Sequence, residues 1–159
     1  MDISTREDIE APIAFVFADL SDFAGFEKTA LRRGAEVART DTLVAPGRGM
    51  QWRATFPFRG KPRRMVLTLE DYAPPGRMRF DIEANNLTGE LTVDLVELSR
   101  RQTRMTVKVK LKPLSLTARV FVQSLRLAKT RITDRMHSRV ALHAADIAER
   151  YRQSPAAAR

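Results

Sequence analysis

The side chains of this sequence that have the chemistry for a functional site are few, and the main candidate lies near the C-terminal end. His143 falls within a run of apolar residues at helical spacing. Near neutral pH a histidine there can act as a general base or as a hydrogen-bond anchor for a ligand carbonyl. General-base chemistry also needs a partner, which the sequence does not display. His143 is therefore a candidate site residue, with an ordinary core histidine as the alternative.

Arg139 lies one helical turn before His143. A guanidinium at the edge of an apolar stripe can pair with a carboxylate or phosphate of a ligand. Its apolar stem can equally lie on the surface and leave the charge in water. The other polar candidates near a pocket are Tyr72, Tyr151 and the Asn85-Asn86 turn.

The residue composition argues against several classes of site. The chain has no cysteine, which excludes disulfides, thiolate metal sites and a cysteine nucleophile. Two histidines are too few for most histidine-based metal sites. No serine is flanked by glycines as in a nucleophile elbow. We therefore expect no metal, no cofactor and no catalytic residue beyond the candidate His143.

The length of the chain suits one domain. Its 159 residues are 43% hydrophobic and 30% charged, enough to bury a core. We expect this domain over residues 1–152 and a disordered tail over residues 153–159. The charged N-terminus lacks the apolar segment of a signal peptide. No uncharged apolar run approaches the roughly 18 residues of a membrane span, so a cytoplasmic location is expected.

The positive charge is concentrated in the C-terminal part of the chain. Residues 1–99 hold 13 Lys and Arg against 16 Asp and Glu, whereas residues 100–159 hold 15 against 3. Such a segment can attract an anionic membrane or a nucleic acid, or it can be a solvated arginine-rich surface. The sequence shows no helix-turn-helix spacing, zinc-ligand set or glycine-rich phosphate loop. A weak contact with a membrane or nucleic-acid surface stays open, as does the oligomeric state.

Seven segments alternate apolar and polar residues with the period of a half-buried strand. Short turns separate most of them, which favours antiparallel neighbours and no parallel βαβ unit. Two short helices are predicted after the first strand, the second beginning at the cap Asp22 and ending at Gly34. The predicted strands are residues 2–10, 35–44, 49–58, 63–72, 77–84, 88–98 and 103–112.

A long basic helix is predicted to close the chain. Between Pro113 and Pro155 there is no glycine or proline, and apolar residues recur at steps of three or four. A straight helix over residues 115–152 would be about 57 Å long at 1.5 Å per residue. That exceeds the size of a small domain, so we expect a bend or break in its first third.

The opening residues carry a resemblance to a known family. Ile9-Glu10-Ala11-Pro12, followed by Val16-Phe17 and Leu20-Ser21-Asp22, resembles the opening of the START-like (SRPBCC) superfamily in its polyketide cyclase/dehydrase-like branch. Phe26 stands where the commonest branch has tryptophan. The resemblance covers residues 2–152 and implies an α+β helix-grip fold. That fold has a seven-stranded curved antiparallel sheet, two short helices after strand 1 and a long C-terminal helix over the sheet.

The resemblance also implies a cavity between the sheet and the long helix that holds an apolar or amphipathic ligand. Large aromatic residues and flexible methionines on the inward strand faces suit an irregular pocket wall, although the same residues would also fill a packed core. The expected lining residues are Trp52, Phe56, Met65, Met78, Phe80, Met105, Phe121, Ile132, Met136, Arg139, His143 and Ile147.

Three functions are compatible with these observations. The first is binding of a small hydrophobic or amphipathic ligand, such as a lipid, a quinone or a polyketide-like molecule, without catalysis. The second is a polyketide cyclase or dehydratase-type enzyme that uses His143 with Tyr151 or Arg139. The third is an interaction module that binds an acidic partner, a membrane surface or RNA, through the basic C-terminal segment.

Overall fold

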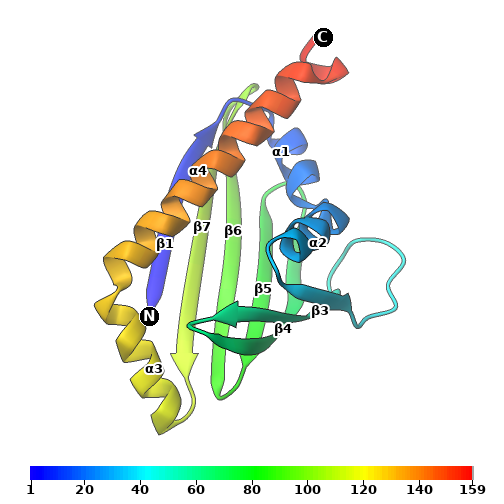
Figure 1. The fold of residues 1–159 in the computed structure, drawn as a ribbon. Helices are drawn as coiled ribbons and strands as arrows, with labels where there is room; N and C mark the ends of the chain where they lie inside the picture. The colour runs from blue at the N-terminus through cyan, green and yellow to red at the C-terminus, as the bar shows by residue number, and fades with distance from the viewer. Residues whose placement is uncertain (159) are drawn as a thin grey trace.

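The computed structural model describes residues 1–158 and has the predicted order of elements (Figure 1). The predicted seven strands, the two short helices after the first strand and the C-terminal helical region are all confirmed. The elements are β1 (Asp2–Ile9), α1 (Ile13–Leu20), α2 (Phe23–Arg32), β2 (Glu36–Arg39), β3 (Gln51–Phe58), β4 (Lys61–Ala73), β5 (Arg77–Ala84), β6 (Leu87–Ser99), β7 (Gln102–Pro113), α3 (Leu116–Leu127), α4 (Lys129–Gln153) and the 3-10 helix η1 (Pro155–Ala158).

The seven strands form one antiparallel sheet in the order β1-β7-β6-β5-β4-β3-β2. The first strand therefore pairs with the last, along residues 2–9 of β1 and 103–110 of β7. The sheet is strongly curved (Figure 1). The curvature brings the tip of the β3–β4 hairpin to α3, the helix that follows β7. At this contact the Arg59 guanidinium donates to Ser124 Oγ over 2.8 Å. The curvature makes one face of the sheet concave.

Strand β2 is shorter than predicted, and Asp41 gives the physical reason. Its carboxylate accepts hydrogen bonds from the backbone N–H groups of Leu43 at 2.9 Å and Gln51 at 2.8 Å. Arg39 donates to the same carboxylate, with its Nε at 2.7 Å. These bonds hold the pKa of Asp41 well below its usual range, the Arg39 hydrogen bond being the largest cause. They fold the chain into a loop where continued strand was expected.

The C-terminal helical region is broken in its first third, as its length predicts. Ser115 caps α3 by accepting from the N–H of Ala118 at 3.1 Å. Ala128 lies between the two helices with φ of −101° and ψ of 15°, which is outside the helical range. Helix α4 then runs alongside β1 and across to α1 (Figure 1).

The core lies toward one end of the molecule, where α1 and the C-terminal half of α4 meet the sheet. Ile147 and Val16 are fully shielded from solvent, and Tyr151 packs on Phe15 with ring centroids 5.1 Å apart. Arg150 joins the two helices through a pair of hydrogen bonds to Asp19, at 2.8 and 2.9 Å. These contacts hold the C-terminal half of α4 to α1 and the sheet.

The segment predicted as a disordered tail has structure where it is described. Residues 155–158 form the 3-10 helix η1, and Ala157 packs against the core. Arg159 lies outside the described residues. Within residues 1–158, no helix has the length and apolarity to cross a membrane.

Candidate functional site

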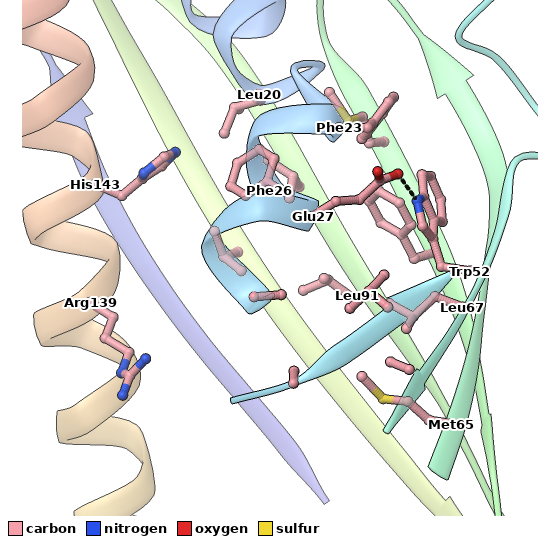
Figure 2. Close-up of a pocket in the computed structure, with 18 of the residues that line it drawn as sticks. Leu20, Phe23, Phe26, Glu27, Trp52, Met65, Leu67, Leu91, Arg139 and His143 are labelled. Atoms are coloured by element: carbon pink, nitrogen blue, oxygen red, sulfur yellow. Dashed lines mark hydrogen bonds between the residues drawn. The ribbon is translucent and has the colours of Figure 1, made fainter. Parts of the chain in front are cut away.

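A cavity of about 530 Å³ lies between the concave sheet face and helices α2 and α4 (Figure 2). Six strands and three helices contribute to its wall. The strand residues are Val37, Trp52, Ala54, Phe56, Met65, Leu67, Met78, Phe80, Leu91, Val93, Met105 and Val107. The remaining residues are Leu20, Phe23, Phe26, Glu27, Ala30, Ala35, Arg139, Val140 and His143.

Strand alternation explains why the sheet side of this wall is continuous. Residues two apart on one strand share a face, and directly paired residues on antiparallel neighbours share that face as well. Trp52 pairs with Leu67, and Ala54 pairs with Met65. The side chains on the concave face of each strand therefore lie beside those of the next strand, and the wall is apolar across the sheet.

Eight of the residues expected from the sequence line this cavity. They come from β3, β4, β5, β7 and α4, so they are brought together only by the curvature of the sheet and the crossing of α4. They are Trp52, Phe56, Met65, Met78, Phe80, Met105, Arg139 and His143.

Four other expected residues, Phe121, Ile132, Met136 and Ile147, lie away from the cavity. Ile147 is fully buried in the core. Phe121, on α3, packs on Phe58 of the β3–β4 hairpin with ring centroids 6.2 Å apart. Ile132 and Met136 are half-buried on the first turns of α4. The expectation is corrected here because periodicity identifies the inward face of a helix but not which turns lie over the cavity.

Helix α2 supplies lining residues that sequence reasoning did not assign to the site. Phe23, Phe26, Glu27 and Ala30 follow the i, i+3, i+4, i+7 spacing of one helix face, and this was the available signal. Asp22 fixes the start of the helix by accepting from the N–H of Gly25 at 3.1 Å. The cap therefore sets which α2 residues face the cavity.

Glu27 is a carboxylate in the lining, and it already has a partner. Its Oε1 accepts a hydrogen bond from Trp52 Nε1 at 2.8 Å (Figure 2). The Trp52 ring also contacts Phe23 and Phe80, with centroid distances of 5.3 and 6.0 Å. The guanidinium of Arg39 lies 5.8 Å from the same ring, at cation–π distance. Trp52 is therefore held in one orientation as part of the wall.

His143 has a buried ring nitrogen without a partner. Within residues 1–158, its Nε2 is shielded from solvent and makes no hydrogen bond. Its ring packs against Phe26 with centroids 5.5 Å apart. Burial is the main cause that lowers the pKa of His143 below its ordinary value of 6.5. The imidazole is therefore neutral at pH 7, with one donor and one acceptor nitrogen.

Arg139 and Phe26 mark the opening of the cavity. Both line it and both are exposed to solvent, from α4 and α2 respectively. Across the described part of the chain, no salt bridge to Arg139 occurs. No cluster of three or more metal-ligating side chains is present in residues 1–158. The site is thus an apolar cavity with the guanidinium of Arg139 at its opening and the His143 ring in its wall, the Nε2 atom of that ring being buried.

Comparison with known proteins locates similarity in structure and not in sequence. No family model matches the chain, and no curated protein matches it significantly. The Zhui aromatase/cyclase from Streptomyces sp. R1128 is 14% identical with a TM-score of 0.66, covering 98% of this chain and 97% of its own. A protein from Thermus thermophilus is 18% identical with a TM-score of 0.65, covering 95% and 96%.

A START superfamily protein from Mycobacterium smegmatis is also similar. It is 12% identical with a TM-score of 0.55, and the match covers 84% of this chain and 95% of that protein. These identities are too low to transfer an activity, but the match spans nearly the whole architecture. The sheet order, the paired short helices and the helix across the concave face are those of the helix-grip architecture that the sequence resemblance implies. The chain therefore has the helix-grip fold of these solved structures, one of which is described as a START superfamily protein.

Proposed function

We propose that this protein binds a small hydrophobic or amphipathic molecule in the cavity, without catalysing a reaction on it. The supporting observation is the cavity itself, about 530 Å³ with a wall that is apolar except at Glu27, Arg139 and His143. Ligand pockets commonly have volumes of about 300–1,000 Å³ and mainly apolar walls. A lipid chain, a quinone or a polyketide-like molecule matches this space and chemistry.

The energetics of an apolar cavity support the same proposal. Unfilled apolar volume costs stability, on the order of 24 cal/mol per Å³ in engineered cavities. A ligand that fills such a space restores dispersion contacts and removes its own apolar surface from water. The rigid Trp52 and Phe80 rings and the adaptable Met65, Met78 and Met105 side chains suit a pocket of this kind.

The enzymatic alternative has less geometric support. A cyclase or dehydratase would use His143 with Tyr151 or Arg139, yet Tyr151 is only 7% exposed and packs in the core beside Phe15. Tyr151 does not line the cavity, so of these two expected partners only Arg139 shares the cavity with His143. An arginine stays protonated and therefore does not serve as the second proton-transfer group.

Titration with the neutral dye N-phenyl-1-naphthylamine tests the proposed function. Trp52 is the single tryptophan of the chain and lines the cavity, so energy transfer from Trp52 to the dye reports binding at this place. We expect saturable binding with a Kd on the order of 10 µM, about −7 kcal/mol. Trp52→Phe is the control that removes the transfer signal. A linear, unsaturable rise in dye fluorescence would contradict the proposal.

A second candidate function, contact with an anionic membrane, is favoured by the outer face of α3. Leu116, Val120 and Leu127 share one side of this helix and are 77%, 62% and 93% exposed. Arg119 and Arg126 flank them on the same helix. Apolar residues bordered by arginines are typical of helices that lie at an anionic lipid interface.

Vesicle co-sedimentation tests this second candidate. We expect binding to vesicles of phosphatidylcholine with phosphatidylglycerol, and little binding to phosphatidylcholine alone. Replacing both Val120 and Leu127 with serine should weaken binding by about a hundredfold, because the two side chains together lose about 3 kcal/mol of transfer free energy. Leu142→Ser, at an exposed leucine of α4, is the matched control. Equal loss in the control would count against a role for α3.

A further inference from the structure

We propose that anionic lipid headgroups bind the arginines at the tip of the β3–β4 hairpin and release the hairpin from α3, so that the cavity exchanges its ligand at an anionic membrane. The inference rests on the proposed function and names the partner that controls access to the same cavity. The observation that carries it is the contact between the hairpin tip and α3, which we call the clasp. The clasp is formed by Phe58, Arg59, Arg63, Phe121 and Ser124.

The clasp is centred on the ring of Phe121. Phe58 packs against this ring with centroids 6.2 Å apart. The guanidinium carbon of Arg59 lies 5.8 Å from the ring centroid and that of Arg63 lies 5.4 Å from it, both at cation–π distance. Arg59 also donates to Ser124 Oγ over 2.8 Å. Both arginines therefore take part in holding the hairpin to α3.

The clasp ties together the two sides of the cavity opening. Phe26 marks one side, on α2, and Arg139 marks the other, on α4. The hairpin belongs to the first side, because β2 follows α2 and pairs with β3. Helix α3 belongs to the second side, because it leads into α4 at Ala128. The hairpin tip reaches α3 (Figure 1), so the clasp connects these sides. The contact between the Phe26 and His143 rings is a second tie between them.

The clasp also holds the end of one cavity wall. Trp52, Ala54 and Phe56 of β3 line the cavity. Phe58 is two residues further along, so it lies on the same face of the strand and continues their row to Phe121. When the clasp is released, the end of the hairpin is free to move away from α3. The opening then widens at that end, and a ligand leaves or enters faster.

The surface around the clasp carries positive charge without carboxylate partners. Within residues 1–158, no salt bridge involves the cations of the hairpin tip (residues 58–64) or of α3. These cations are Arg59, Lys61, Arg63, Arg64, Arg119 and Arg126. A lipid phosphate offers an arginine a bond in which both partners are charged, with two parallel hydrogen bonds to one guanidinium. Anionic headgroups therefore compete with Phe121 and Ser124 for the arginines of the clasp.

The outer side of α3 favours a membrane over a nucleic acid as this partner. Leu116, Val120 and Leu127 are exposed on the helix that carries Arg119 and Arg126. A bilayer offers such side chains an apolar phase, whereas a nucleic acid attracts proteins mainly through its phosphates. The same helix provides its half of the clasp. Insertion of α3 into the headgroup layer therefore brings the clasp to the lipid phosphates.

Transfer of N-phenyl-1-naphthylamine from the cavity to vesicles, followed by stopped flow, tests the proposal. Energy transfer from Trp52 is lost as the dye leaves, so the rate constant of this loss measures exchange. Vesicles of phosphatidylcholine with phosphatidylglycerol are compared with phosphatidylcholine alone at equal lipid concentration. We expect the anionic vesicles to accelerate the loss about tenfold, the factor for release of two exposed cation–π contacts.

Three variants separate headgroup binding from the clasp itself. Arg59→Gln with Arg63→Gln should remove the difference between the two vesicle types. Arg6→Gln with Arg100→Gln, at exposed arginines outside the hairpin and α3, removes the same charge and should preserve the acceleration. Phe121→Ala keeps every charge and removes the ring at the centre of the clasp. It should speed transfer to phosphatidylcholine vesicles about tenfold and leave co-sedimentation with anionic vesicles unchanged. Circular dichroism checks that each variant is folded.

The outcomes separate this inference from the proposed function. If the dye does not bind, both fail. If the dye binds but leaves at the same rate to both vesicle types, or if Phe121→Ala leaves the rate unchanged, the inference falls and the proposed function stands. Loss of the acceleration in the variant at Arg6 and Arg100 would reduce the effect to general attraction by a basic protein and would also overturn it. Equal acceleration by polyuridylate added to phosphatidylcholine vesicles would assign the surface to nucleic acid and overturn the membrane as the partner.

Discussion

Val140→Trp is expected to weaken binding of N-phenyl-1-naphthylamine by up to about a hundredfold while the protein stays folded. Val140 lines the cavity from α4 between Arg139 and His143, and it is half-buried. An indole at this position projects into the space that the ligand needs. Forcing extra atoms against a packed group costs about 1–3 kcal/mol. At the upper end of this range the dye should bind about a hundredfold more weakly, since each 1.4 kcal/mol is a factor of ten.

Leu142→Trp is the control for this variant. Leu142 is two residues away on the same helix but is 68% exposed and does not line the cavity. It introduces the same side chain without entering the cavity, so dye binding should stay within about twofold of the unmodified protein. Circular dichroism of both variants checks that α4 is retained. Unchanged binding in Val140→Trp would place the dye elsewhere and remove the main support for the proposed function.

Ile147→Ala is expected to lower the free energy of unfolding by about 2–5 kcal/mol, the range for large-to-small substitutions at fully buried sites. Ile147 is fully shielded from solvent and holds the C-terminal half of α4 against the core. Its removal leaves a void where the helix is anchored, because neighbouring side chains relax only in part. This is a large fraction of the roughly 5–15 kcal/mol by which a domain is stable.

Urea denaturation followed by far-UV circular dichroism measures this effect. The midpoint should move to lower urea while the slope stays the same, as for a change in stability without a change in the surface exposed on unfolding. Leu142→Ala, on the exposed face of the same helix, should change stability by no more than about 0.5 kcal/mol. A midpoint for Ile147→Ala that matches this control would contradict the description of α4 as anchored at that turn.

Most of the fold was predictable because its signals are local. Strand alternation placed Trp52 and Phe56 on one face of β3, and the cap at Asp22 set the start of α2. The break near Ala128 followed from length alone, since an unbroken helix would outrun the domain. The main miss in the strands was the length of β2, which depends on Asp41 bonding to Gln51, ten residues further along the chain. The apolar–polar alternation of a strand carries no information about a hydrogen bond between residues ten positions apart.

The candidate site was predictable in composition but not in extent. The strand residues of the lining followed from parity, because residues two apart always share a face. The helix residues did not, because an apolar stripe looks the same over a cavity, over a core or beside a hairpin. Ile147 and Phe121 are apolar residues like Val140, yet of these three only Val140 lines the cavity. Phe26 and Glu27 were missed because nothing local shows that α2 closes the cavity.

Local chemistry in the chain was enough to establish the order of strands and helices, the inward face of each strand, the excess of positive charge after residue 99 and the presence of His143 on an apolar helix face. The tertiary structure decided where the sheet and α4 separate, which turn of α4 faces that space and that the His143 ring is partly buried beside it. The physical reason is that periodicity is set by neighbouring residues. An enclosed volume depends on sheet curvature and helix crossing, which bring together residues from opposite ends of the chain.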